Sequence, residues 1–93
     1  MLYEWNEDKN ASNQKNHGIS FEEAVTVFDQ SRYLLYEDQK PAAEQRFIAI
    51  GHSKKGNHLL VVHCYRVREH EERIRIISAR KVTKAEERSL EGL

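Results

Sequence analysis

Two strand-like stretches near the C-terminus limit what this chain can fold into more than any other feature. Apolar residues recur through His58–Val67 and again through Arg73–Val82, and a short polar stretch containing "EHEE" separates the two. Extended segments joined this closely pair as an antiparallel hairpin. A third segment, Arg46–His52, is joined to the first by "SKKGN", Ser53–Asn57, in which Gly56 can take the positive φ of a hairpin turn. The sequence thus predicts an antiparallel sheet with three long strands.

The first half of the chain contains an unusually polar helix. Asn6 can cap a helix over Glu7–His17, and Gly18 can end that helix with a positive φ. Ala11 is its one clearly apolar residue, so the apolar stripe through which a helix normally docks is missing. The helix could rest on the sheet margin with Asn13 bonded to backbone, or its polar side chains could line a groove.

Two capping boxes mark the other helices. Ser20 with Glu23 opens a helix over Phe21–Asp29, and Thr83 with Glu86 opens a short terminal helix. Further expectations are strands at Leu2–Trp5 and Arg32–Tyr36, a loop over Glu37–Gln45 around Pro41, and a buried helix face of Phe21, Ala24, Val25 and Phe28. The order β-α-α-β-β-β-β-α predicts one α+β domain over residues 1–93, with two N-terminal helices packed on one face of a small antiparallel sheet.

Length and composition exclude several classes of protein. The 93 residues suit one compact domain, and no apolar run approaches the roughly 20 residues that span a bilayer. The chain starts without a signal peptide, and its single cysteine, Cys64, cannot form an internal disulfide, which favours the cytoplasm. The net charge is zero, but residues 1–45 carry nine acids against four bases (−5), and residues 46–93 carry eleven bases against six acids (+5). A basic half of this kind suits phosphates or an acidic protein.

Arginine is concentrated on the last two predicted strands. Its planar fork makes two parallel hydrogen bonds to a phosphate, which favours an anionic ligand lying across the sheet. Regular alternation would place Arg73, Arg75, Ile77, Ala79 and Lys81 on one face, and Ile74, Ile76, Ser78, Arg80 and Val82 on the other. The structural alternatives are a solvent-facing Arg66 and an Arg80 that pairs with Glu22 or Glu23.

The sequence predicts neither a metal site nor a cofactor site. His63 and Cys64 are adjacent on a strand and point to opposite faces, while His58 lies six residues before Cys64, about 20 Å along an extended strand. No glycine-rich phosphate loop, dinucleotide fingerprint or nucleophile elbow occurs in the sequence.

Two stretches resemble the signatures of a known family. "EWNEDKNASNQKNHGISFEEAVTVF", Glu4–Phe28, resembles the opening signature of the BrnT toxins of bacterial type II toxin–antitoxin systems. That signature has a tryptophan, an acidic turn, a lysine, an asparagine, a Lys/Asn-His-Gly and a helix-opening Ser/Asp-Phe. "RIRIISARKVTKAEER", Arg73–Arg88, resembles their closing signature, a strand ending Ser-x-Arg before a basic helix, and "RFIAIG" and "LLVVHCYR" also fit. The chain departs at Asn6, where aspartate is common, and at Asn16, where lysine is common.

The resemblance implies a RelE-like fold and a metal-independent endoribonuclease that cuts RNA to slow growth. The residues that match the family's motifs, and are expected to be catalytic, are Lys9, His17, Arg66 and Arg80. Histidine is the side chain suited to proton transfer near neutral pH, and the arginines would stabilise the charge of a pentacoordinate phosphate. Glu22, Tyr65, Arg75 and Lys81 are expected to contact the substrate. We expect the four catalytic side chains to converge beside the first helix.

The resemblance also implies a protein partner. This would be a BrnA-type ribbon-helix-helix antitoxin, whose dimer would form a heterotetramer with two toxins and provide the only contact with DNA. Two alternatives stay open from the sequence. The basic sheet could bind an acidic antitoxin segment in a catalytically inactive chain, or the chain could be a nucleic-acid-binding regulator that does not cleave.

Overall fold

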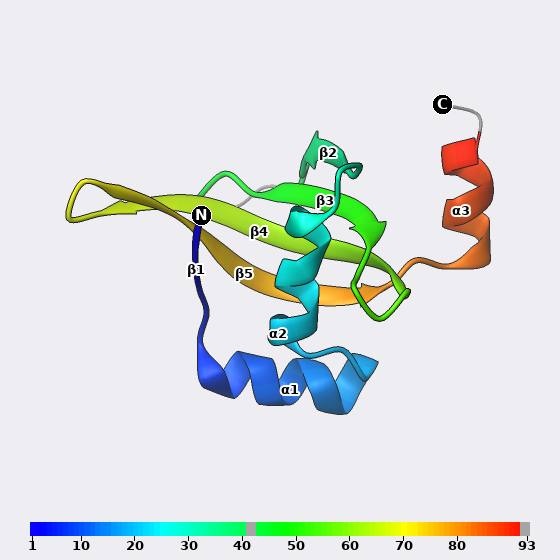
Figure 1. Ribbon diagram of the computed structural model, residues 1–93, viewed down its shortest axis with the longest axis horizontal. Coiled ribbons are helices and arrows are strands. Elements are labelled where there is room, and N and C mark those ends of the chain that lie inside the picture. The colour runs from blue at the N-terminus through cyan, green and yellow to red at the C-terminus, as the bar shows by residue number, and fades with distance from the viewer. Residues whose placement is uncertain (41–42, 92–93) are drawn as a thin grey trace.

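The structure is a computed structural model that describes residues 1–40 and 43–91 (Figure 1). Its elements are β1 (Leu2–Glu4), α1 (Glu7–His17), α2 (Phe21–Ala24), the 3₁₀ helix η1 (Val25–Asp29), β2 (Leu34–Glu37), β3 (Phe47–His52), β4 (His58–Arg68), β5 (Glu71–Lys81) and α3 (Lys84–Glu91). This order confirms the predicted α+β fold. The turn expected at Pro41 lies outside the described residues. Within the described ranges, no helix combines the length and the apolar character needed to cross a bilayer.

The five strands form one sheet in the order β1-β5-β4-β3-β2. β4 and β5 are its longest strands and form the predicted hairpin, which projects beyond the other elements in Figure 1. β1 lies at one edge and pairs with β5 in parallel, with Leu2 opposite Arg73. The prediction of a purely antiparallel sheet is therefore wrong at this edge. No short turn joins β1 to β5, and its direction therefore could not be inferred from turn lengths.

α1 and α2 pack on the same side of the sheet, and the core lies beneath them (Figure 1). The predicted helix over Phe21–Asp29 is α-helical only to Ala24 and then continues as the 3₁₀ helix η1. Its buried apolar residues are spaced by three, at Phe21, Ala24 and Val27. The predicted Val25 and Phe28 are only partly buried against this core.

α1 docks through asparagines in place of an apolar stripe. Asn13 donates to the carbonyl oxygens of Ile19 and Ala79, at 2.8 and 2.7 Å, and accepts from the Ala79 N–H at 3.2 Å. Asn10 accepts from the Phe21 N–H at 2.9 Å. Both asparagines are buried. The predicted bonding of Asn13 to backbone is confirmed, and its amide occupies the β5 edge as a neighbouring strand would.

A β-bulge in β5 interrupts the regular alternation. Val62 lies opposite Ser78, and the next β4 residue, His63, lies opposite Ile76, so Ile77 is the extra residue. One extra residue moves every later side chain to the other face of the sheet. The prediction that Arg75 shares a face with Ala79, and Ile76 with Arg80, is therefore wrong across this bulge.

Candidate functional site

The bulge at Ile77 gathers the arginines of the hairpin on one face. Ile74, Ile76 and Ala79 are buried beneath the helices. No helix of the N-terminal half covers the opposite face. It carries the even-numbered side chains of β4 and the β5 side chains that pair with them. We call it the open face. Its β4 and β5 side chains are His58, Leu60, Val62, Cys64, Arg66, Arg68, Glu71, Arg73, Arg75, Ser78 and Arg80.

One end of the open face holds an arginine cluster, defined as Arg66, Arg68, Arg73 and Arg75. Two carboxylates partly balance it. Glu4 accepts from Arg75 at 2.7 Å and from Arg68 at 3.0 Å, and Glu44 accepts from Arg66 at 3.0 Å. Although burial opposes the shift, the hydrogen bonds from Arg75 and Arg68 lower the pKa of Glu4. Glu71, opposite Arg68 on the same face, is a third carboxylate, so four guanidinium groups against three carboxylates leave this end of the face with a charge of +1.

Arg66 and Arg73 are the members of the cluster that the fold leaves incompletely satisfied. They lie directly opposite each other in the β4–β5 ladder. Like charges in that position destabilise a sheet. The Nε atoms of both are buried and have no hydrogen-bond partner among the described residues. An anion accepting from both groups would relieve the repulsion and fill the missing bonds.

Cys64 lies beside this cluster and is fully buried. Its thiol donates to Glu44 Oε1 at 3.3 Å, and this hydrogen bond is the main cause of a lowered pKa at Glu44. Burial raises the pKa of the thiol itself, so Cys64 is held as a neutral thiol and not as a nucleophilic thiolate. The site residues here are therefore the arginines.

The other end of the open face contains a cavity of about 450 Å³, which we call the His17 hollow. It is lined by His17, Asp38, Lys40, Ile48, Leu60, Val62, Ser78, Ala79, Arg80 and Glu86. His17 reaches it because α1 ends beside Ala79, where Asn13 fastens the helix to β5. Half-buried apolar residues form the floor, and two cations, two carboxylates and an imidazole line the rest.

Arg80 is held at this hollow by α3. Its Nη1 and Nη2 donate to the two carboxylate oxygens of Glu86, at 2.7 and 2.8 Å. This fork, helped by the Thr83 N–H, lowers the pKa of Glu86 to about 2 and raises that of Arg80. The sequence left open that Arg80 forms an ion pair with a helix acid, and the structure shows such a pair. Its partner is Glu86 of α3, and not Glu22 or Glu23 as expected.

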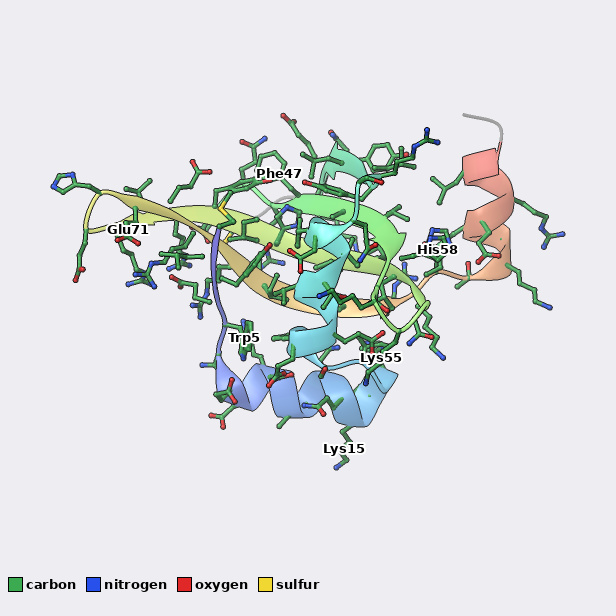
Figure 2. The ribbon with its side chains drawn as sticks, viewed as in Figure 1. Trp5, Lys15, Phe47, Lys55, His58 and Glu71 are labelled. Atoms are coloured by element: carbon green, nitrogen blue, oxygen red, sulfur yellow. The ribbon has the colours of Figure 1, made fainter. Side chains whose placement is uncertain are left out.

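The four expected catalytic residues do not share one cavity. His17 and Arg80 line the same hollow, whereas Arg66 lies about 20 Å away, six residues along β4 from the partner of Arg80. Figure 2 shows the span: His58 marks the end nearest α3, and Glu71 marks the distal end of the hairpin. Lys9 is exposed on α1, about 12 Å along the helix from His17. The structure therefore presents two cationic ends of one face.

Three of the expected substrate contacts lie on the helix-covered side. Tyr65 packs beside Phe47, and its hydroxyl lies 3.3 Å from His63 Nε2. Glu22 accepts from Asn10 on the helix layer. Lys81 lies opposite Leu59, a core residue. Arg75 alone among the four reaches the open face.

Several residues at these two ends were absent from the predicted site. They are Arg68, Arg73, Lys40, Glu44 and Glu86. The alternating pattern placed Arg73 on the same face as the predicted Arg75, so Arg73 could have been included; that both share a face with Arg80 follows only from the bulge. Glu86 is visible in the sequence as a capping residue, and it does accept from the Thr83 N–H at 2.9 Å. Its second partner, Arg80, depends on where α3 meets the sheet.

The arrangement suits a flexible polyanion. Cations lie at the two ends of the face, about 20 Å apart, and the hollow at one end combines an imidazole with a guanidinium. Guanidinium groups bind phosphate oxygens through paired donors, and a single strand can lie across several such groups. A histidine and an arginine that line the same hollow can provide proton transfer and charge stabilisation.

Comparisons with known proteins identify the fold and the family. Among solved structures, the crystal structure of the Brucella abortus ribonuclease toxin BrnT is similar in fold, with a TM-score of 0.63 at 20% identity over 90% of this chain and 100% of that chain. No curated protein matches the chain. The family described as "Ribonuclease toxin, BrnT, of type II toxin-antitoxin system" matches residues 5–86. Because that match spans most of the sequence, this chain belongs to the BrnT family of ribonuclease toxins of type II toxin–antitoxin systems.

Proposed function

We propose that this protein is a metal-independent endoribonuclease that binds single-stranded RNA along the open face and cuts it at the His17 hollow. The observation that carries the proposal is the bulge at Ile77, which puts Arg66, Arg73 and Arg80 on one face with a hollow that His17 lines. The arginine cluster would hold phosphates that flank the reacting one. Lys9, exposed on the adjoining helix, would contact the RNA beyond the hollow.

The chemistry follows from the groups at the hollow. The RNA 2′-oxygen forms a bond to the adjacent phosphorus as its proton passes to a base, and the bond from phosphorus to the 5′-oxygen breaks as that oxygen is protonated. His17 is placed for one of these proton transfers. Arg80 and Lys40 would stabilise the added negative charge of the pentacoordinate phosphate. The products are a cyclic phosphate and a free 5′-hydroxyl.

The test is cleavage of RNA by the purified protein with EDTA present. His17→Gln and Arg80→Gln should each lower the rate by at least about 100-fold, the usual cost of losing a group that stabilises the transition state. Lys15→Gln, an exposed neighbour of His17 on α1, is the matched control and should leave the rate unchanged. Cleavage that stops with EDTA would overturn metal independence.

A second control separates the charge of Arg80 from its structural bond. Glu86→Gln weakens the pair with Arg80 while leaving the guanidinium in place. Cleavage should persist or increase, because Arg80 is freed for phosphate. A loss of cleavage equal to that of Arg80→Gln would mean that the ion pair supports the fold and that Arg80 does not act on RNA.

We further propose that a BrnA-type ribbon-helix-helix antitoxin neutralises this toxin in the cytoplasm, as a heterotetramer in which the antitoxin binds the DNA. Membership of a type II toxin–antitoxin family supports a protein partner. The net positive charge at the arginine cluster would suit an acidic antitoxin segment. Growth arrest on induced expression, relieved by the neighbouring small gene, would support this proposal.

The alternative is a catalytically inactive chain that only binds the antitoxin or a nucleic acid. The ion pairs of Arg66 and Arg80 favour it, since both already bind carboxylates as they would an acidic segment. The same cleavage assay separates the two functions. RNA that stays intact while the partner binds the open face would establish the alternative.

A further inference from the structure

The two edges of the sheet differ, because the short strand β1 forms one edge and β2 forms the other. β1 pairs with Arg73–Arg75 of β5, and farther along β5 the Asn13 amide bonds to the N–H and C=O of Ala79. At the other edge, β2 is the last strand, and no described residue pairs with its outer side. An edge strand with free backbone groups is a template for another strand.

The side chains at this open edge are large, apolar and exposed. The exposed fractions are 40% for Tyr33, 41% for Leu34, 49% for Leu35 and 38% for Tyr36. Single exposed apolar residues are ordinary, but here four follow one another along the edge, Tyr33 just before β2 and the other three within it. They also lie on both faces of the sheet, since Leu34 is opposite Ile50 and Leu35 is opposite Ala49. Covering this edge would therefore bury apolar surface on both faces of the sheet.

The backbone of β2 specifies which residues can bond outward. The Asp38 N–H donates to the Arg46 carbonyl at 2.8 Å. Residues that bond to one neighbour alternate along an antiparallel strand. Asp38 and every second residue before it therefore point their backbone groups toward β3, and Leu35 and Glu37 point theirs away from the sheet.

A second copy of this chain fits that edge in one self-consistent register. Two antiparallel edge strands are related by a two-fold axis perpendicular to the sheet, which requires paired residues of the same parity. Leu35 opposite Leu35 of the second copy satisfies this and uses the outward-pointing backbone groups. The same register places Leu34 against Tyr36, Tyr33 against Glu37, and Arg32 against Asp38 of the second copy. It thus buries the patch and pairs opposite charges at both ends.

We propose that the protein self-associates through its β2 edge, joining two five-stranded sheets into one ten-stranded sheet. The perpendicular axis keeps the two open faces on the same side. Each His17 hollow, which Asp38 lines, would then lie close to the junction. The proposal does not depend on RNA cleavage, because it rests on the backbone bonds, the exposed patch and the charge pattern of β2.

A charge exchange tests the register. Arg32→Asp and Asp38→Arg each create two like-charge contacts in a dimer of identical copies, so each variant alone should sediment as a monomer. Mixed in equal amounts, the two variants restore both opposite-charge contacts and should associate. The unmodified protein should associate as its concentration rises in sedimentation velocity. Unmodified protein that stays monomeric at every concentration would overturn the proposal, and so would a mixture that behaves as its separate components do.

Disulfide formation gives an independent measure that works for weak association. Leu35→Cys should cross-link to itself under mild oxidation, because hydrogen-bonded partners in this register have Cα atoms about 5.5 Å apart. Glu37→Cys should not, because its two introduced thiols would be four residues apart, about 13 Å. Equal cross-linking of the two variants would rule out the register. If Leu35→Lys leaves a monomer unchanged but abolishes binding of the antitoxin, the edge belongs to that partner and not to a second copy.

Discussion

Arg66 lies directly opposite Arg73 in the β4–β5 ladder, with the Nε atoms of both buried and unbonded among the described residues. The pairing places like charges side by side on the open face, which costs stability in a sheet. A strand that served only the fold would gain from a neutral residue at either position. The pair is therefore the best structural indication that this face binds an anion.

Replacing Arg73 should separate folding from binding. Arg73→Gln removes the cross-strand repulsion, so the free energy of unfolding should stay unchanged or rise by up to about 1 kcal/mol. Loss of one phosphate contact should lower the slope of log binding constant against log salt by about 0.7 for single-stranded RNA. Denaturant unfolding and RNA titrations at several salt concentrations measure the two effects. Arg88→Gln, an exposed cation on α3, should change neither, and a clear loss of stability in Arg73→Gln would contradict this account.

Asn13, which bonds α1 to β5, should contribute more to the free energy of unfolding than a small polar side chain usually does. Asn13→Ala leaves the Ala79 N–H and the carbonyls of Ala79 and Ile19 without this partner in a buried place. We expect the free energy of unfolding to fall by about 3 kcal/mol. Asn16→Ala, an exposed asparagine on the same helix, should be neutral or slightly stabilising. Urea unfolding of the two variants makes the comparison, and equal effects would mean that α1 docks by other means.

The fork between Arg80 and Glu86 predicts a pH dependence of stability. Because the folded pKa of Glu86 is lowered to about 2, folding favours its charged form. The contribution is complete above the unfolded pKa of about 4.3 and is lost as the pH falls through that value toward 2. The melting temperatures of the unmodified protein and of Glu86→Gln should therefore converge as the pH falls from about 5 to about 2, the range between the unfolded and the folded pKa. A difference between the unmodified protein and Glu86→Gln that stays constant from about pH 5 to about pH 2 would contradict this account.

The bulge should not tolerate the loss of its extra residue. Deleting Ile77 either exposes Ile74 and Ile76 or shifts the register of β5 against β4, because one residue inverts every following side chain. We expect the deletion to abolish cooperative unfolding, as seen by near-ultraviolet circular dichroism. Ile77→Ala keeps the residue count, and it should unfold cooperatively with only moderate loss of stability. A folded, RNA-binding deletion variant would show that the bulge does not position the arginines.

The sequence by itself determined the order of the elements and both ends of α1, while most strands begin or end one or two residues from their predicted positions. The predicted bounds of α1, Glu7–His17, match those observed, and the Asn6 side chain accepts from the Lys9 N–H as expected of an N-cap. Ser20 and Thr83 likewise accept the capping bonds assigned to them. These features could be predicted because their hydrogen bonds join residues three or four apart, within the reach of a short sequence window.

Only the tertiary structure decided how the candidate site is assembled. Neither the bulge at Ile77 nor the parallel pairing of β1 leaves a local signature, and together they determine which side chains lie beside Arg66. The partner of Arg80 was likewise set by where α3 meets the sheet. The physical reason is that strand register is selected by burying Ile74, Ile76 and Ala79 together, a condition on the whole core that no single stretch of sequence contains.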